Sequence, residues 1–378
     1  MDNFSKILDD SYRRALNRRT KSFISNTNIR KKVETVALCL RNRAGVRALL
    51  AGLLAKIDSP SVDIRKPYTD IAGETGDDRY SGRFYDERYI QQLADLPYRL
   101  PINATTAFLT PGFRTKNTVL TVDVSLEGRP AEMYRALLEL FGAIQKKHID
   151  ATTIMDETMR LLVIERDQRQ ASIEKLVRDI SRTVDQLPLS AEQIVVLISQ
   201  HLACKNAARL PVLVVAAAYQ AASRRLGEQT RRLQAHTAAD KQTGALGDVE
   251  ITLINNNDIL TVYEMKLKAV TIHDINLALE KLEGHTATLR NYIFITTEWI
   301  DPELLQYAAD RYEQLGGIEI AILDCLGFLR HFLHLFHSLR TEFLDNYQKL
   351  LLAEPESAVS HTLKEAFLTL RKAAEGSQ

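Results

Sequence analysis

The clearest pattern of hydrophobic and polar positions lies between residues 247 and 267. Residues 247–254 alternate between the two types and are rich in β-branched side chains, which is typical of a half-buried strand. Residues 259–267 form a second, more hydrophobic stretch of the same kind. Asn255, Asn256, Asn257 and Asp258 separate them and favour a turn, since Asn and Asp tolerate a left-handed backbone. The pattern therefore predicts a β-hairpin.

Helix and strand patterns alternate after this hairpin. Residues 272–284 place Ile272, Ile275, Leu279 and Leu282 on one helical face, and Gly284 is positioned to end the helix. Continuous hydrophobic runs at 291–297 and 318–323 predict buried strands, with a helix at about 302–315 between them. The predicted fold class is therefore α/β (α+β), with a mixed sheet flanked by helices.

The patterns in most of the remaining segments predict helices. A long helix is expected from Val33 to Ile57, ended by Ser59 and Pro60, and helices dominate from 131 to 226. Residues 66–117 are rich in Gly, Pro, Tyr and Arg and predict loops. We expect four parts: a helical and loop-rich region at 1–130, a helical connection at 131–209, the α/β core at 210–325, and C-terminal helices at 326–378.

The hairpin brings charged residues together. Cross-strand partners should have numbers that sum to about 513, so that Asp248 lies opposite Glu264 to Lys266. Alternation along a strand places Glu264 and Lys266 on one face, and Tyr263 and Met265 on the other. Whether Asp248 shares the face of Glu264 depends on the register, which the sequence leaves open.

These residue types suit a divalent metal. Mg²⁺ prefers oxygen ligands, which the carboxylates of Asp248 and Glu264 and the backbone carbonyl of Met265 would supply. Lys266 would orient or deprotonate a water and offset charge on a phosphate. Glu250 is a candidate ligand for a second metal, and a bound cation would relieve repulsion among the carboxylates. The alternative interpretation is a strand with alternating charges exposed to solvent.

The order of these elements resembles the core of the PD-(D/E)xK nucleases. Three further segments resemble SacI-type restriction endonucleases: 66–73 (Lys-Pro-Tyr-Thr-Asp-Ile-Ala-Gly), 80–89 (Tyr-Ser-Gly-Arg-Phe-Tyr-Asp-Glu-Arg-Tyr) and 107–117 (Ala-Phe-Leu-Thr-Pro-Gly-Phe-Arg-Thr-Lys-Asn). The resemblance spans about residues 35–345 and includes Asp274-Ile275 at the start of a helix. Many PD-(D/E)xK nucleases carry an acidic residue on the helix that precedes the metal-binding strands. The corresponding helix here, at 210–225, carries none, so Glu228 or Glu250 would have to take the place of that residue.

The resemblance implies a type II restriction endonuclease. Such an enzyme would cut both strands of double-stranded DNA with Mg²⁺, at a short palindrome such as a GAGCTC-like site. A palindrome needs two active sites related by symmetry, so a homodimer is expected. Two alternatives remain. One is a repair or junction nuclease on the same core that recognises DNA structure. The other is a DNA-binding regulator whose acidic and basic residues form a salt-bridge patch only.

The charge distribution is compatible with a DNA partner. Residues 1–66 contain fifteen Lys or Arg but six Asp or Glu, a net charge of +9 in a chain whose total is +1. Arg can bond bidentately to guanine, and Lys can contact phosphates. The candidate DNA-binding residues are Arg79, Arg83, Arg88, Arg114, Lys116 and Lys268. The alternative is that the basic residues form solvated helix faces and that the nearby tyrosines, such as Tyr89, pack in a core.

Other sequence features constrain the environment. The three cysteines are far apart and form no Cys-x-x-Cys pair, so neither a zinc site nor a disulfide framework is expected. No stretch is hydrophobic enough for a signal core or a membrane span, so we expect no membrane contact and a cytoplasmic, bacterial protein. The single tryptophan, Trp299, is expected to pack against the protein.

Overall fold

The chain forms two units in a computed structural model. The structure describes residues 2–71, 73, 76–103, 105–114, 116–126, 128–181, 187–233, 245–282 and 288–376. One unit comprises Met1–Ala171 and the other Ser172–Gln378, and their boundary falls within helix α6 (Ala151–Ser181). The predicted segment 131–209 therefore contributes to both units.

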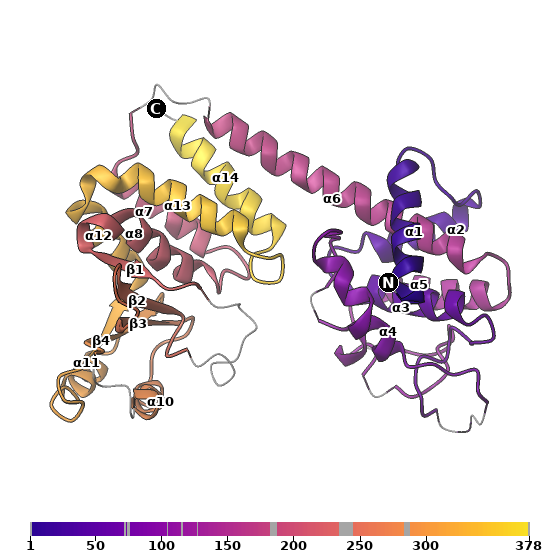
Figure 1. The fold of residues 1–378 in the computed structure, drawn as a ribbon, viewed down its shortest axis with the longest axis horizontal. Helices are drawn as coiled ribbons and strands as arrows, with labels where there is room; N and C mark the ends of the chain where they lie inside the picture. Colours follow the sequence, from indigo (N-terminus) through magenta and orange to yellow (C-terminus); the bar gives the residue numbers. More distant parts are fainter. Residues whose placement is uncertain are drawn as a thin grey trace. The chain divides into compact units, whose positions relative to one another are not determined.

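The first unit is helical and is built around one buried helix. It contains α1 (Asn3–Asn17), α2 (Thr27–Ala37), α3 (Ala44–Asp58), α4 (Gly82–Arg88), α5 (Ala131–Gln145) and the beginning of α6, with short 3-10 helices at Ile90–Ala94 and Ala107–Leu109 (Figure 1). Every residue of α3 from Ala44 to Ala55 is buried. A helix that is hydrophobic on all sides needs such an enclosed position.

The predicted helix from Val33 to Ile57 is wrong, because residues 38–43 separate α2 from α3. Asn42 explains the interruption. Its side-chain oxygen accepts a hydrogen bond from the backbone N–H of Ala44 at 2.9 Å, and its amide donates to the Tyr134 hydroxyl at 2.9 Å. Asn therefore satisfies the start of a new helix, and the chain can turn between two helices whose periodicity looks continuous.

The second unit contains a mixed sheet of five strands in the order β1-β2-β3-β4-β5. The strands are β1 (Glu228–Thr230), β2 (Val249–Leu253), β3 (Ile259–Lys266), β4 (Asn291–Thr296) and β5 (Glu319–Asp324). β1, β2 and β3 are antiparallel, whereas β3, β4 and β5 are parallel. The expected combination of helices and a mixed sheet is confirmed, and the fold class is α+β.

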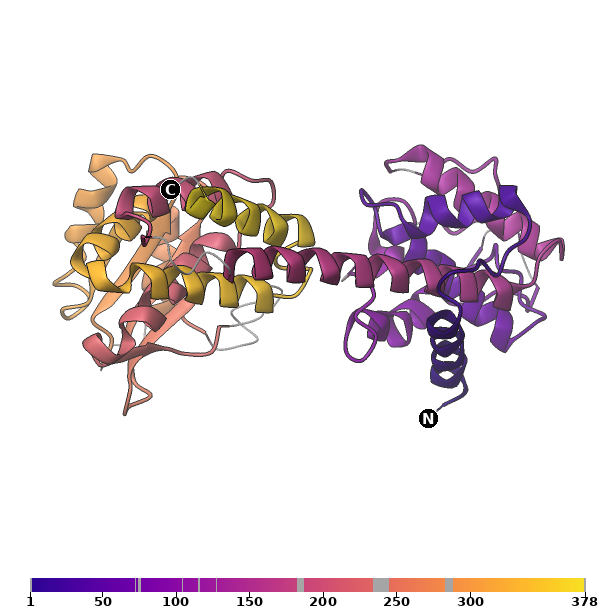
Figure 2. The same cartoon turned by 90° about the horizontal axis from the view of Figure 1, so that it is seen from above.

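Helices cover both faces of this sheet. On one face lie α7 (Ala191–Leu202), α8 (Leu210–Leu226), α12 (Cys325–Leu335), α13 (Arg340–Ala353) and α14 (His361–Gly376), with a 3-10 helix at His337–Leu339 (Figure 1). Figure 2 shows α13 and α14 side by side. On the other face lie α10 (Ile272–Leu282) and α11 (Pro302–Ala309). The sheet therefore has a hydrophobic core on each side.

The predicted elements of this unit agree with the observed ones except at particular points. The short strand β1 has no counterpart in the prediction, and α11 ends at Ala309 rather than near 315. Gly284, the expected end of α10, lies outside the described residues. Trp299 does not pack against the protein, since it is 77% exposed in the loop after β4.

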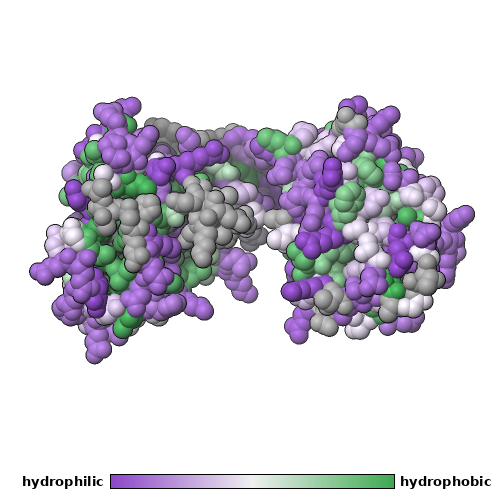
Figure 3. All heavy atoms as spheres, turned by 60° about the horizontal axis from the view of Figure 1, so that its bottom comes forward, coloured by the Kyte–Doolittle hydropathy of each residue, from purple (hydrophilic) through white to green (hydrophobic). Residues whose placement is uncertain are grey.

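Polar side chains are prominent on one face of each unit. In Figure 3, hydrophilic side chains cover most of the visible face of each unit, with smaller hydrophobic areas between them. Among the helices that the structure describes, none combines the length and the hydrophobicity required to cross a bilayer.

Candidate active site

The register of the hairpin determines which side chains share a face. β2 pairs with β3 so that Val249 lies opposite Tyr263, and the next step places Asp248 opposite Glu264. The partner numbers sum to 512, close to the predicted sum. Because directly opposite residues point to the same side of a sheet, Asp248, Glu264 and Lys266 belong to one face, which α10 and α11 cover.

Asp248 is held against the backbone of β3. Its carboxylate Oδ2 accepts a hydrogen bond from the N–H of Met265 at 2.8 Å. Gly247 permits this close approach: a Cβ at that position would lie 2.5 Å from Cγ1 of Val262 and 2.9 Å from the carbonyl oxygen of Tyr263. A side chain at position 247 would therefore force the start of β2 away from β3, and Asp248 with it.

Glu264 is surrounded by donors from three elements. Its Oε1 lies 3.3 Å from the Lys266 ammonium, and its Oε2 lies 3.4 Å from the ammonium of Lys281 on α10. The Tyr292 hydroxyl on β4 donates to the same Oε2 at 3.1 Å. Tyr292 is 1% exposed, and its hydroxyl also lies 3.3 Å from the carbonyl oxygen of Leu246. The sequence analysis did not identify Lys281 or Tyr292.

Lys266 lies between two carboxylates. Its ammonium is 3.3 Å from Glu264 and 3.1 Å from Asp274. Asp274 is fixed by a capping box at the start of α10, in which its Oδ2 accepts from the N–H of Thr271 at 2.9 Å and the Thr271 hydroxyl accepts from the N–H of Asp274 at 3.3 Å. The sequence analysis noted Asp274 only as part of the resemblance.

These contacts shift the pKa values of both partners. Burial disfavours the charged form of Lys266, but Glu264 and Asp274 outweigh that effect and raise the pKa of the ammonium above its ordinary value. Burial also acts against ionised Asp274, yet hydrogen bonds from Thr271 and Lys266 lower the pKa of its carboxyl. Lys266 is therefore protonated at neutral pH, which suits it to orient a water rather than to deprotonate one.

Glu250 lies on the same face, but both oxygens of its carboxylate already have partners within the protein. Its side chain is 7% exposed; Oε2 lies 2.8 Å from the guanidinium of Arg231, and Oε1 accepts from the N–H of Leu246 at 2.8 Å. Glu228 belongs to the opposite face, where its charge acts on Tyr263, and burial raises the pKa of its carboxyl. Neither residue is presented to a metal beside Asp248.

Basic side chains offset the carboxylates of this cluster. Lys266 and Lys281 lie against Glu264, and Arg231 lies against Glu250. The expected repulsion among carboxylates is thus relieved within the protein itself. Among the residues that the structure describes, no three His, Cys, Asp or Glu side chains are grouped so that they could hold a metal ion by themselves.

Most of the candidate DNA-binding residues lie in the first unit. Arg83 and Arg88 are exposed on α4; Arg83 pairs with Glu87 at 2.7 Å, and the Arg88 guanidinium lies 5.8 Å from the centre of the Phe84 ring. In the loops, Arg114 is exposed, whereas Arg79 and Lys116 are half-buried. Lys268 is exposed in the second unit, two residues after the end of β3.

A buried ion pair organises the loop-rich region that carries these residues. Arg47 on α3 and Asp86 on α4 are both fully buried, with Nε and Oδ1 2.6 Å apart. Arg47 also donates to the carbonyl of Asn103 at 2.5 Å, and Asp86 accepts from the Thr106 hydroxyl at 2.6 Å. Tyr89 is 4% exposed, so the core alternative holds for this tyrosine.

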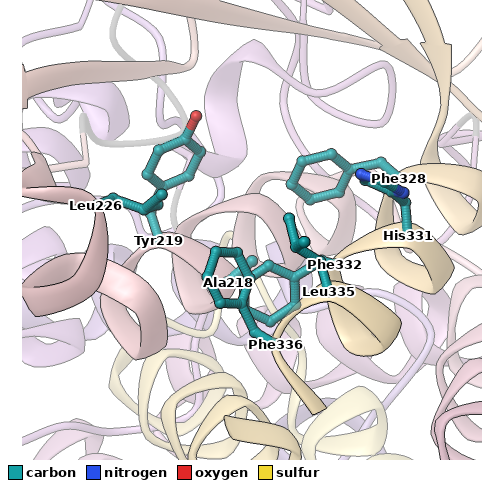
Figure 4. A pocket seen from close by; sticks show the side chains of 8 residues that line it. All are labelled: Ala218, Tyr219, Leu226, Phe328, His331, Phe332, Leu335 and Phe336. Carbon is teal, nitrogen blue, oxygen red and sulfur yellow. The ribbon is translucent and has the colours of Figure 1, made fainter. Parts of the chain in front are cut away.

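A hydrophobic pocket lies on the opposite face of the sheet from Asp248. Side chains of α8 and α12 face each other across it (Figure 4). Its lining includes Tyr219, whose hydroxyl lies 2.9 Å from that of Tyr263, and Phe328, Phe332 and Phe336. Since this lining is almost wholly hydrophobic, the pocket offers no set of groups for phosphate or metal chemistry.

Comparison with known proteins adds no family to this description. No family model matches the chain, and no curated protein is significantly similar to it in sequence.

Proposed function

We propose that this protein is a Mg²⁺-dependent endonuclease that cuts double-stranded DNA, of the type II restriction kind that its sequence resembles. The observation that carries the proposal is the placement of Asp248 beside Met265, with Glu264 and Lys266 on the same face of a mixed sheet. The arrangement agrees with what the resemblance to PD-(D/E)xK nucleases implies for these positions.

The donor set fits magnesium rather than a softer metal. The groups are two carboxylates, Asp248 and Glu264, and the backbone carbonyl of Met265, all of them oxygen donors. Mg²⁺ is commonly held by one or two carboxylates together with substrate phosphates and water, so a third acidic residue is not required. When bound, the ion would lower the pKa of a water and neutralise charge on the phosphate.

The surrounding side chains position this set. Tyr292 and Lys281 hold Oε2 of Glu264, which fixes the orientation of the carboxylate on β3. Asp274 holds Lys266 in its protonated form. Protonated Lys266 would donate to the attacking water or to a non-bridging phosphate oxygen, where negative charge develops in the transition state.

The proposed DNA partner follows from charge as well as from the resemblance. The basic first 66 residues and Arg79, Arg83, Arg88, Arg114 and Lys116 lie in the first unit, and Lys268 lies next to the candidate active site. Cleavage of both strands at a palindrome, such as a GAGCTC-like sequence, would use a homodimer with one active site for each strand.

One observation favours a second candidate function. Lys266 and Lys281 already offset the charge of Glu264, and Arg231 offsets that of Glu250, as expected of a DNA-binding regulator with a salt-bridge patch. A nuclease that recognises DNA structure would share the active site but not the sequence specificity.

Cleavage assays distinguish the three candidates. Pure protein is incubated with unmethylated phage DNA, with and without Mg²⁺, beside Lys266→Ala and a control, Lys349→Ala, which alters an exposed lysine on α13. Discrete fragments that require Mg²⁺, vanish with Lys266→Ala and persist with Lys349→Ala support the proposal. Tight duplex binding without cleavage identifies the regulator, and cleavage confined to branched or damaged DNA identifies the structure-specific nuclease.

A further inference from the structure

Two loops leave the sheet at the same edge, immediately beyond the candidate active site. β3 and β4 are parallel and end together at the pair Lys266 and Thr296. The loops 267–271 and 297–301 follow. The Thr296 hydroxyl at the end of β4 donates a hydrogen bond to the carbonyl of Lys268 in the first loop at 3.4 Å. We call the exposed surface formed by Leu267, Lys268, Ile272 and Trp299 the rim.

The rim exposes large hydrophobic side chains. Trp299 is 77% exposed, Leu267 is 53% exposed and Ile272 is 51% exposed. Neighbours in the same segments are turned inward: Val270 is 7% exposed, and Ile300 packs against the core beneath α10 and α11. The loops therefore supply hydrophobic side chains to the core and direct a second set outward, and a group of exposed hydrophobic side chains is typical of contact surfaces.

The position of the rim favours duplex DNA over a second protein, because the rim continues directly from β3, the strand that carries Glu264 and Lys266. Lys268 and His273 are exposed in the same segment as Leu267 and Ile272, and Glu298 is exposed next to Trp299. The carboxylate of Asp301 is used to cap α11, where it accepts from the N–H of Glu303 at 3.0 Å. Protein interfaces are depleted of charged residues at their centre. Proteins that bind DNA combine cations for phosphates with aromatic or aliphatic side chains that lie against bases or enter a groove.

We propose that the rim contacts the groove of duplex DNA next to the phosphate that is cut, with the Trp299 indole placed against a base or between neighbouring bases. Lys268 contacts a flanking phosphate, and Leu267 and Ile272 lie against deoxyribose and base edges. This inference rests on the proposed function, and it assigns a DNA contact to a residue that the candidate active site does not contain.

The single tryptophan makes the inference directly measurable. Since the chain contains one Trp, the indole emission reports on the rim alone when it is excited at a wavelength that tyrosine does not absorb. A duplex bearing the cleavage site is added to Lys266→Ala in Mg²⁺, and the emission and its quenching by acrylamide are recorded. Stacking on a base should quench the emission, and contact with DNA should shield the indole from acrylamide.

Variants of the rim provide the second measurement, with affinity read from the anisotropy of a labelled duplex. Trp299→Ala should weaken binding about tenfold, as loss of one base–aromatic contact does, and Trp299→Phe should retain part of the affinity. Glu298→Ala is the matched control in the same exposed loop. It should bind the duplex as tightly as the parent or more tightly, because it removes a negative charge.

The outcomes separate this inference from the proposed function. Duplex binding with unchanged emission, and with full affinity in Trp299→Ala, overturns the role of the rim and leaves the endonuclease proposal intact. Absence of any duplex binding overturns both. A third outcome would also overturn the inference: the emission changes with protein concentration and not with DNA, and Trp299→Ala no longer forms dimers. The rim would then be a contact surface for a second copy of the chain.

Discussion

Lys266 is the residue whose chemistry depends most on its neighbours. Its ammonium is shared between Glu264 on its own strand and Asp274 on α10. Both carboxylates favour the charged lysine, and their combined effect exceeds the cost of its partial burial. The charge that would face a phosphate is therefore stabilised by a residue that has no ligand role of its own.

Replacing Asp274 with Asn should test this positioning role. The variant keeps a side chain of similar shape but removes one of the two charges that raise the pKa of Lys266. Since the lysine acts when protonated, the alkaline fall in kcat/KM should begin at lower pH than in the parent, and activity at neutral pH should drop about tenfold. The measurement is a pH profile of cleavage from about pH 7 to about pH 10.

Glu280→Gln is the matched control for that profile, because it removes an exposed carboxylate from the same helix. Its profile should overlay that of the parent. If Asp274→Asn lowers activity uniformly with no change in the position of the alkaline limb, Asp274 supports only the fold of α10.

At the scale of elements, the hairpin was predictable and its surroundings were not. Alternation and the Asn-rich turn identify both strands, and parity places Glu264 and Lys266 on one face. Tyr292, Lys281 and Asp274 reach Glu264 and Lys266 through the parallel β3–β4 pairing and the packing of α10, which are contacts between distant segments. Sequence periodicity carries no information on such contacts.

The remaining differences also have physical causes. β1 has three residues, too few to show an alternating pattern. The gap between α2 and α3 depends on hydrogen bonds of Asn42 to partners that include a distant tyrosine. The hydrophobic character of an indole favours burial, yet Trp299 is exposed. The loop after β4 turns the side chain of Ile300 towards the core instead.

The ion pair between α3 and α4 should dominate the stability of the first unit. Asp86→Ala leaves the fully buried guanidinium of Arg47 without its carboxylate, which should lower the free energy of unfolding by about 3–5 kcal/mol. Arg83→Ala removes an exposed pair with Glu87 and should cost less than about 1 kcal/mol. Calorimetry on the full chain measures the loss of stability in both variants. An equal loss in Asp86→Ala and Arg83→Ala would show that Arg47 finds another partner or reaches solvent when Asp86 is removed.

A buried histidine joins three helices of the second unit and links stability to pH. His201 on α7 is fully buried, 3.0 Å from the hydroxyl of Tyr347 on α13 and 3.0 Å from the carbonyl of Leu363 on α14. Burial lowers its pKa from 6.5 to about 4. Between about pH 4 and pH 6.5, the histidine is therefore protonated in the unfolded chain and neutral in the folded chain.

The contribution of His201 is fully present above about pH 6.5 and should be lost as the pH falls towards 4, by roughly 3 kcal/mol in all. Unfolding by denaturant, followed by circular dichroism at several pH values, measures this slope. His201→Gln should be less stable at neutral pH but should show a shallower loss in this range. An identical slope in both proteins would assign the pH dependence to other groups.

For the whole molecule, the proposed cleavage of both strands requires two active sites. A mixture of wild-type and Lys266→Ala chains should form mixed dimers with one competent site. On a supercoiled plasmid such dimers should release nicked circles before any linear product, since each site cuts one strand. Linear product without a nicked intermediate, or a chain that stays monomeric on its DNA site during sedimentation, would contradict this assembly.

The two lysines against Glu264 have a consequence for how metal and DNA would bind together. A magnesium ion must compete with both ammonium groups for that carboxylate, so metal binding to the protein alone should be weak. A phosphodiester gives the ammonium groups a new anionic neighbour and gives the metal extra oxygens. Under the proposed function each ligand therefore strengthens the binding of the other by the same factor, as linkage requires. The enzyme would load its metal when DNA is in place.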